Sequence, residues 1–359
     1  MKKYRVLVIN PGSTSTKVGV FDGEDCIYEG TVRHSTEELS KYPNIIDQAP
    51  MRMELIRNLL KENNIDIATV DAFIGRGGIV KPMRSGTYTV NDKLLYDLEH
   101  LPSALSHASC LGGVFARQFG DEYGKPYFIA DPVVVDEREQ IAKITGLPGV
   151  ERSGVFHCLN QKAVARRYCK EHGIRYEDAN IIVAHLGGGN TIGAHHHGVV
   201  VDVNDGINGE GPFSPERLGG LQVKTVLDLL ESGKYTIAEM RTLCSKSGGF
   251  VAHFGTNNAL EIEKRAMAGD EQASLMFYAL GYNVAKTIGE MAVVLKGKVD
   301  AIIITGGQGY SKPLCKYIEE MVGFIAPVVV YPGEGELEAL AASAIRVLEG
   351  EEEAKEYLG

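Results

Sequence analysis

Apolar and polar residues follow two different rhythms along this chain, and each rhythm predicts one type of element. Short apolar runs bounded by glycine, proline or polar turns are typical of buried strands. They predict strands at residues 5–9, 17–21, 72–74, 127–130, 181–185, 191–195, 301–305 and 327–331. Longer stretches repeat apolar residues at the helical period and predict helices at residues 47–63, 157–172, 271–296 and 336–348. Because strands and helices alternate, the predicted fold class is α/β.

Two predicted strand pairs share one pattern: a strand, a turn of small residues, and a second strand. Residues 6–9 lead through 10–16 into 17–20, and residues 181–185 lead through 187–190 into 191–194. Two halves that each open on such a hairpin suggest a duplicated domain with a cleft between the copies. Glycine-rich hairpins are common, so this echo is modest support by itself. The acidic segment 349–353 after the last helix is expected to be solvated or frayed.

Composition narrows the class of protein. The 359 residues include 42 glycines, where an average composition of about 7% would give about 25. The formal charge of −10 argues against nucleic acid or an anionic membrane as the partner. Six scattered cysteines without a C-x-x-C pair indicate a reducing compartment. With no signal peptide and no membrane-length apolar run, we expect a cytoplasmic protein.

The common nucleotide motifs are absent, since no P-loop and no Rossmann fingerprint follows a predicted strand. Two other turns could cradle phosphates through backbone N–H groups and hydroxyls. The first runs from Asn10 to Lys17 and is, on its own, slightly better explained by an ordinary β-turn with a solvated lysine. The second places His185 before Gly187, Gly188 and Gly189, and three consecutive glycines after a strand favour a ligand. The turn 306–309 supports a nucleotide or a tight connection equally.

Charged residues stand where other predicted strands end. Arg76 lies among glycines, where a guanidinium can hold a carboxylate or a phosphoryl group with two bonds. Asp131 precedes a proline and, without context, is an ordinary turn former. Arg217 lies in a loop rich in proline and glycine. The run from His195 to His197 could bind zinc, although neighbouring strand residues face opposite ways and a polar strand end is the simpler interpretation.

Taken together these segments resemble the acetokinase family, and within it the butyrate kinases. The matching motifs span essentially the whole chain in order: residues 10–17, 75–78, 107–112, 131–137, 156–165, 185–189 and 209–217. The segments 10–17 and 156–165 resemble the whole family, whereas 131–137 and 209–217 resemble the butyrate branch in particular.

The resemblance implies the two-domain fold of acetate and sugar kinases, Hsp70 and actin (ribonuclease H-like), with duplicated mixed-sheet domains. One domain would comprise residues 1–150 plus 337–359 and the other, which binds the nucleotide, residues 151–336, with the active site in the cleft between them. The implied reaction is reversible: ATP and a short-chain carboxylate give ADP and an acyl phosphate by direct in-line transfer. The family also implies Mg²⁺ and a homodimer or larger homo-oligomer.

Roles carry over by position in the motifs. Arg76 is expected to hold the substrate carboxylate, Arg217 the phosphoryl in flight, and His157 the transition state. Asp131 is expected to be the metal-linked catalytic aspartate, and His107 a further active-site histidine. Contacts to ATP are expected from Asn10, Ser13, Ser15, Lys17, His185, Gly187, Gly188, Gly189, Gly306, Gly307, Gln308, Gly309 and Tyr310. The metal is expected at Asn10, Asp131 and Glu336.

Two departures from the family pattern leave questions open. The family's Asn-Glu-Glu is here Glu334-Gly335-Glu336, so either carboxylate could act on the metal. After Asn257 and Asn258 the charges expected near adenine are absent. Butyrate is the expected acid, with isobutyrate or other branched acids also possible substrates, and acetate or propionate kinase activity is the nearest alternative. A non-catalytic ATP-dependent clamp of the Hsp70 and actin fold and a zinc hydrolase are alternatives of other classes.

Overall fold

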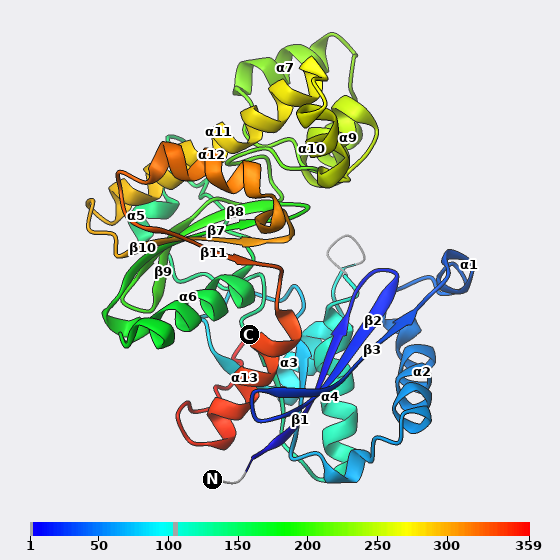
Figure 1. Cartoon of the computed structure of the whole chain (residues 1–359). Coiled ribbons are helices and arrows are strands. Elements are labelled where there is room, and N and C mark those ends of the chain that lie inside the picture. The colour runs from blue at the N-terminus through cyan, green and yellow to red at the C-terminus, as the bar shows by residue number, and fades with distance from the viewer. Residues whose placement is uncertain (1–2, 103–106) are drawn as a thin grey trace. The chain divides into compact units, whose positions relative to one another are not determined.

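The computed structural model describes residues 3–102 and 107–359. The chain divides into two compact units (Figure 1): unit 1 comprises Met1–Val135 and Gly335–Gly359, and unit 2 comprises Asp136–Glu334. Within the described residues, no helix combines the length and the apolar character needed to span a membrane.

Unit 1 is built on a six-stranded mixed sheet in the order β3-β2-β1-β4-β6-β5. Neighbours β1, β2 and β3 are antiparallel, β4 and β6 run parallel to β1, and β5 is antiparallel to β6. The strands are β1 (Arg5–Pro11), β2 (Ser15–Asp22), β3 (Asp25–Arg33), β4 (Ala72–Arg76), β5 (Thr87–Thr89) and β6 (Tyr127–Ala130). The helices are α1 (Thr36–Leu39), α2 (Ala49–Glu62), α3 (Asp92–Glu99), α4 (Cys110–Tyr123) and α13 (Glu336–Leu348).

Helices α2 and α4 pack their apolar sides on the sheet of unit 1, in a core that includes Ile9, Ile56, Phe73 and Phe115. The C-terminal helix α13, red in Figure 1, returns to this unit and contacts β1, β4 and β6. The segment farthest along the chain therefore joins the sheet that the first residues begin.

Unit 2 is built on a five-stranded mixed sheet in the order β11-β10-β7-β8-β9. Its strands are β7 (Asn180–Leu186), β8 (Asn190–His196), β9 (Val199–Val203), β10 (Ala301–Gly306) and β11 (Val328–Pro332). Helices α11 and α12 share one apolar core with the sheet, and α6 shares a second. The helices are α5 (Gln140–Lys143), α6 (Cys158–His172), α7 (Val223–Glu231), α8 (Ile237–Thr242), α9 (Gly249–Phe254), α10 (Ala259–Met267), α11 (Glu271–Val294) and α12 (Lys312–Val322).

The two sheets repeat one pattern of connections. The series β3-β2-β1-β4-β6 corresponds, strand by strand, to β9-β8-β7-β10-β11. In each, the first three strands are antiparallel neighbours and the last two run parallel to the third. The echo in the sequence thus corresponds to a duplicated mixed sheet, and the α/β class is confirmed.

All the predicted strands and helices are present. The sequence did not predict β3, β5 or β9, which each lie at a sheet edge, although it did predict β11 at the remaining edge. In β3 the burial signal is weak, because an edge strand has a strand on one side only and all nine residues of β3 are exposed or half-buried. Helix α6 ends, as its glycine predicts, where Gly173 adopts a left-handed conformation with φ 66°.

The unit boundary falls after Val135 rather than near residue 150. The segment from Asp136 belongs to unit 2 because its polar groups are bonded there. The carboxylate of Glu137 accepts from the Lys162 ammonium at 2.7 Å, with both side chains almost fully buried. The guanidinium of Arg138 donates to the Ser153 carbonyl at 2.8 Å.

The acidic tail is ordered rather than frayed from Glu352 onward, so that prediction is wrong for this part. The carboxylate of Glu352 accepts from the Thr87 N–H at 2.8 Å and from Arg346 at 3.1 Å. The backbone of Lys355 then exchanges hydrogen bonds with Thr87 and Thr89, which extends the sheet at β5. Backbone pairing at a sheet edge holds a segment whose side chains alone predict solvation.

Candidate functional site

The first predicted phosphate turn, between β1 and β2, is held from behind by a buried arginine that the sequence analysis did not single out. Arg52 in α2 has no exposed surface. Its guanidinium donates to the carbonyls of Gly12 at 2.8 Å and Ser13 at 3.1 Å, and to the hydroxyl of Thr16 at 3.2 Å. With the carbonyls drawn toward Arg52, the turn's remaining N–H groups and hydroxyls are left for a ligand.

Arg52 keeps its charge although none of its hydrogen-bond partners in the described part of the chain is a carboxylate. Burial lowers the pKa of its guanidinium to about 10, so it remains protonated at neutral pH. Burial, helped by the charge of Arg52, lowers the pKa of the neighbouring His34 to about 4. A signal for Arg52 was available, since it lies at helical spacing with the buried Ile56 and Leu60.

The predicted residues of the hairpin lie on and around this turn. Ser13 and Lys17 are exposed and Ser15 is half-buried. Lys17 pairs with Asn10 across β1 and β2, so both side chains leave the same face of the sheet. Only 8% of Asn10 is exposed. The turn therefore presents a cation and hydroxyls beside a nearly buried amide.

Arg76 at the end of β4 forms an ion pair with Glu336 at the start of α13. The second carboxylate oxygen of Glu336 accepts from Asn10 Nδ2 at 2.7 Å. These contacts bring Asn10, Arg76 and Glu336 together, although they lie on three separate segments. Glu334 belongs to unit 2, where its carbonyl accepts from Asn160 at 2.6 Å. The geometry therefore favours Glu336 over Glu334 as the acidic group beside Asn10.

Asp131 follows β6 and is 3% exposed. One carboxylate oxygen accepts from the Gly86 N–H at 2.8 Å. Its backbone has φ 40°, a left-handed conformation that is strained for a residue other than glycine. Strain of this kind concentrates at functional sites, which agrees with the role expected for Asp131.

His107 is exposed, and its Nδ1 accepts from the Ser109 N–H at 3.2 Å. A neutral ring with an accepting Nδ1 carries its proton on Nε2. The ring donor of a neutral His107 is therefore Nε2.

The glycines around Arg76 are required by packing. A Cβ on Gly75 would lie 1.9 Å from the carbonyl oxygen of Gly112 in α4. A Cβ on Gly77 would lie 2.7 Å from Pro132, and one on Gly78 would lie 2.5 Å from Cys110. Helix α4 and strand β4 approach so closely that side chains would not fit between them.

In unit 2 the side chains of His157 and His185 stack, with ring centres 3.8 Å apart and 9° between the planes. His157 lies just before α6 and His185 near the end of β7. The Nδ1 of His157 is 2.9 Å from the Thr191 hydroxyl, and the Nδ1 of His185 is 2.7 Å from Asn160 Oδ1. The fold thus brings together two histidines that the sequence places far apart.

Arg217 lies against the second glycine turn. A Cβ on Gly189 would be 1.8 Å from Arg217 Nη1, so only a glycine leaves room for the guanidinium. Nη1 donates to the Gly206 carbonyl at 2.6 Å, while the buried Nε has no hydrogen-bond partner among the described residues. Burial lowers the pKa of Arg217, and Glu216 and Asp205 act in the opposite direction. A half-buried cation with an unused, buried donor is suited to an anionic ligand.

The third glycine turn, 307–310, is tied to the second. The amide of Gln308 donates to the Gly187 carbonyl at 2.7 Å and to Asn190 Oδ1 at 3.1 Å. The side chain of Gln308 is thus engaged within the protein, whereas Tyr310 is 70% exposed. Asn257 donates to Glu216 at 2.6 Å and Asn258 caps α10, so both asparagines have structural partners.

The histidine run at the end of β8 does not converge on one point. His195 is fully buried and bonded to Tyr176 at 2.7 Å. His196 is exposed and bonded to Asn180 at 2.7 Å, and His197 lies in an exposed turn with φ 51°. In residues 3–102 and 107–359, no group of three His, Cys, Asp or Glu side chains could hold a metal ion.

The residues expected at magnesium fit that ion by their chemistry. Asn10, Asp131 and Glu336 offer oxygen donors only, which Mg²⁺ prefers. The Asn10 amide gives a hydrogen to Glu336, so its oxygen remains the atom suited to a metal. Magnesium sites in kinases usually use one or two carboxylates and complete the shell with phosphates and water, so a protein cage of three acids is not required.

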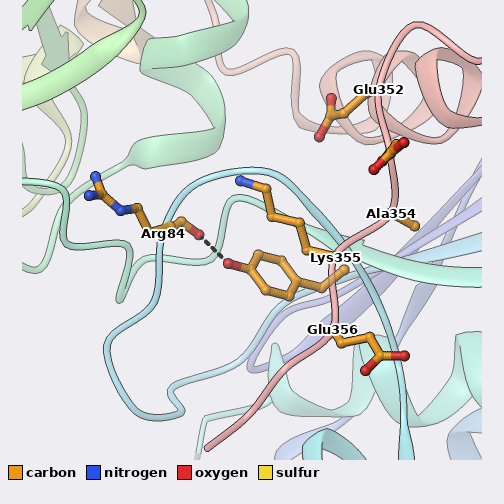
Figure 2. A pocket seen from close by; sticks show the side chains of 7 residues that line it. Arg84, Glu352, Ala354, Lys355 and Glu356 are labelled. Atoms are coloured by element: carbon orange, nitrogen blue, oxygen red, sulfur yellow. Dashed lines mark hydrogen bonds between the residues drawn. The ribbon is translucent and has the colours of Figure 1, made fainter.

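A shallow surface pocket on unit 1 contains none of the predicted site residues. It is lined by Arg84, Tyr88 and residues 352–356 of the tail. The Tyr88 hydroxyl donates to the Arg84 carbonyl at 2.8 Å. Figure 2 shows Arg84 and Lys355 among the side chains that line the pocket. The Lys355 ammonium donates to the Ser85 carbonyl. These groups hold the tail on the sheet, and we assign the pocket to that packing.

Comparison with known proteins adds to this geometry. The sequence model of the acetokinase family matches residues 142–322. The chain is 50% identical over 355 residues to butyrate kinase 2 of Clostridium acetobutylicum, covering 99% of both chains. The chain belongs to the acetokinase family. A probable butyrate kinase of Clostridium botulinum is also 50% identical, over 354 residues and 99% of both chains.

The fold expected for the acetokinase family is confirmed. The crystal structure of the acetate kinase of Porphyromonas gingivalis is similar with a TM-score of 0.80, over 96% of this chain and 100% of that chain. The two sequences are 21% identical, a level at which the likeness shows the fold.

Proposed function

We propose that this protein transfers the terminal phosphoryl group of ATP to the carboxylate of a short-chain fatty acid, with butyrate as the acceptor. The observation that carries the proposal is the 50% identity to butyrate kinases over 99% of both chains. Among the acetokinase family these relatives favour butyrate over acetate or propionate. The half-buried cations Arg76 in unit 1 and Arg217 in unit 2 support a ligand rich in negative charge.

In the proposed reaction a carboxylate oxygen of the acid attacks the terminal phosphorus of ATP. A P–O bond forms as the bond to ADP breaks, and ADP leaves with that electron pair. A carboxylate needs no base to attack, so the protein has to position two anions and to stabilise the charge on the phosphoryl oxygens.

Arg76 is the residue we propose for the acid. Its Nη1 is occupied by Glu336, and Glu336 is its one hydrogen-bond partner among the described residues. The Nη2 and Nε donors are therefore available to a carboxylate. Because the guanidinium is planar and rigid, the bond from Nη1 to Glu336 fixes the direction in which Nη2 and Nε point.

For the nucleotide we propose Asn10, Ser13, Ser15 and Lys17 in unit 1. In unit 2 we propose the residues around the glycine turns: His185, Gly187, Gly188, Gly189, Gly306, Gly307, Gln308, Gly309 and Tyr310. Because Gln308 has its amide bonded to Gly187 and Asn190, its expected part is to hold the turn rather than to contact ATP. Arg217, with its unused Nε donor, and His157 are proposed at the phosphoryl group.

Magnesium is proposed at Asn10, Asp131 and Glu336, where it would neutralise phosphate charge. The resemblance further supports a cytoplasmic homodimer or larger homo-oligomer, which sedimentation would test.

The direct test traps acyl phosphate. The enzyme is incubated with Mg-ATP, hydroxylamine and one acid at a time, from formate to valerate with isobutyrate included, and hydroxamate is measured. We expect the highest kcat/KM with butyrate. Highest activity with acetate or propionate would instead assign that acid, and ATP binding without hydroxamate from any acid would support the non-catalytic clamp.

The acid site is tested separately with Arg76→Ala. We expect a large rise in the KM for the acid with little change in the KM for ATP. Arg57→Ala is the matched control, because Arg57 is also an arginine of unit 1 paired with a glutamate, at the surface. Unchanged kinetics in Arg76→Ala would contradict the assignment.

A further inference from the structure

Behind His157 a buried line of polar side chains runs through the interior of unit 2. Tyr176 contacts His195 at 2.7 Å, His195 contacts Gln161 at 3.1 Å, and Gln161 contacts Thr191 at 3.0 Å. The Thr191 hydroxyl then contacts His157 Nδ1 at 2.9 Å. Tyr176 is 5% exposed, and Gln161, Thr191 and His195 have no exposed surface. Water therefore does not compete for these bonds.

The direction of the hydrogen bonds is set by one backbone carbonyl. Gln161 has a terminal atom 3.0 Å from the Thr191 carbonyl oxygen, which can only accept, so that atom is the amide nitrogen. The amide oxygen of Gln161 then faces His195 Nε2, which must donate. Gly193 makes room for this oxygen, because a Cβ there would lie 2.4 Å from it.

The orientation of the Gln161 amide sets the hydrogen-bond roles at both ends of the line. Burial, with a smaller effect of the charges of Lys162 and Arg166, holds the pKa of His195 well below its usual range, so the ring is neutral. A neutral ring that donates from Nε2 accepts at Nδ1, here from the Tyr176 hydroxyl. At the other end the Thr191 oxygen accepts from the Gln161 amide at 3.0 Å and from the His157 N–H at 3.5 Å.

With both acceptor positions of the Thr191 oxygen used, its own hydrogen is left to donate to His157 Nδ1. A neutral imidazole that accepts at Nδ1 carries its proton on Nε2. We propose that Thr191 and Gln161 are positioning residues that fix His157 as the Nε2–H tautomer, a neutral donor to the transferring phosphoryl group. The last part of this statement rests on the proposed function, whereas the tautomer does not.

The stacked partner, His185, is held in the opposite way. Asn160 donates from its amide nitrogen to the Glu334 carbonyl at 2.6 Å, so its oxygen accepts from His185 Nδ1 at 2.7 Å. A neutral His185 therefore carries its proton on Nδ1. Two rings 3.8 Å apart are thus assigned opposite tautomers by two different neighbours. This contrast provides an internal reference for the experiment.

The tautomers can be measured without a variant. In the wild-type protein with ¹⁵N-labelled histidine, long-range ¹H–¹⁵N spectra distinguish a protonated ring nitrogen from an unprotonated one. His157→Gln and His185→Gln identify the two sets of signals among the ten histidines. We expect an unprotonated Nδ1 for neutral His157 and a protonated Nδ1 for neutral His185. A protonated Nδ1 on neutral His157 would overturn the proposal.

The positioning role is tested with Thr191→Val, which keeps the shape and removes the hydroxyl. We expect the His157 signals to lose the single tautomer, and kcat to fall on the order of 10²-fold, the usual cost of losing one donor to developing charge. Because the interaction is made with the transition state, KM should change little. Thr191→Ser restores the hydroxyl and should restore both kcat and the tautomer.

Thr287→Val is the matched control, since Thr287 is also a buried threonine of unit 2, bonded to Asn283 in α11. It should leave kcat and the His157 signals unchanged. A folded Thr191→Val with wild-type kcat would overturn the positioning role. If Thr191→Val does not fold, the test is Thr191→Ser, and loss of activity in that variant would also overturn the positioning role. If the wild type phosphorylates no acid, the proposed function fails, while the wild-type spectrum still decides the tautomer.

Discussion

Gly189→Ala is expected to disable the enzyme by displacing Arg217 while leaving the fold intact. The added Cβ would lie 1.8 Å from Arg217 Nη1 and 2.2 Å from Cζ. These atoms are the far end of a flexible side chain, so the guanidinium moves rather than the backbone. The φ angle of Gly189 is not positive, so alanine can adopt the same backbone conformation without strain.

The size of the effect follows from the distances. To return from 1.8 Å to an ordinary contact of 3.4 Å, Nη1 must retreat by about 1.6 Å. A misplacement of about 1 Å at a reacting centre can cost on the order of 10²-fold in rate. The shift also breaks the 2.6 Å bond from Nη1 to Gly206, and a hydrogen bond from a charged group contributes about 1.5–3 kcal/mol to stability. We therefore expect kcat to fall at least 10²-fold and the free energy of unfolding to fall by no more than about 3 kcal/mol.

The assay is acyl-phosphate formation at saturating ATP and acid, with unfolding followed by circular dichroism. Gly289→Ala is the matched control in α11 of the same unit, because its Cβ would meet no atom within 4 Å. It should leave kcat unchanged and stabilise the helix by up to about 1 kcal/mol.

A double-mutant cycle decides whether Gly189 acts through Arg217. In an Arg217→Ala background the guanidinium is gone, so adding Gly189→Ala should reduce kcat little further. Full additivity of the two losses, or wild-type kcat in Gly189→Ala alone, would refute the reasoning.

The remaining predictions concern the support of the site and of the C-terminal tail. Replacing Arg52 with methionine should weaken ATP binding about tenfold or more, because the turn carbonyls lose charge-assisted hydrogen bonds; isothermal titration with unchanged ATP affinity would contradict this. The pKa of His34 is lowered from 6.5 to about 4 in the folded protein, so the unfolded chain takes up the proton first as the pH falls. Stability should therefore drop by about 3 kcal/mol between pH 6.5 and pH 4, and urea melts of His34→Gln should show a shallower decline. Tyr357→Phe removes the hydroxyl that donates to Asp97 at 2.8 Å and accepts from the Lys81 N–H, and should lower the free energy of unfolding by about 1–2 kcal/mol with kcat unchanged; an equal melting temperature would disprove the link.

Some residues of the site could be predicted because short sequence segments around them already indicate their chemistry. Arg76 among glycines, His185 before three glycines and Arg217 in its loop could each be singled out from their neighbours alone. The motif match identified His157 and Glu336, and the ion pair of Glu336 with Arg76 supports the choice over Glu334.

Other parts of the site could not be predicted from local sequence. Gln161 lies one helical turn after His157, and Thr191 is an ordinary polar residue of β8. Only the tertiary structure links the Gln161 side chain through Thr191 to the His157 ring. The spacing of Arg52 with Ile56 and Leu60 places it on the buried side of α2, but only the folded hairpin shows which carbonyls its guanidinium holds. The need for glycine at position 75 also comes from tertiary structure, because Gly112 of α4 lies against it.

The sequence by itself determined the α/β class, the duplicated hairpins, the family and the residue types for phosphoryl transfer, because periodicity and local motifs are properties of consecutive residues. Tertiary structure decided which backbone carbonyls anchor the amides of Gln161 and Asn160, and hence which nitrogen of His157 and of His185 carries the proton. The direction of these hydrogen bonds depends on backbone carbonyls, which can only accept and which folding brings close from distant segments. The pattern of residues along the chain does not show which carbonyls will be close.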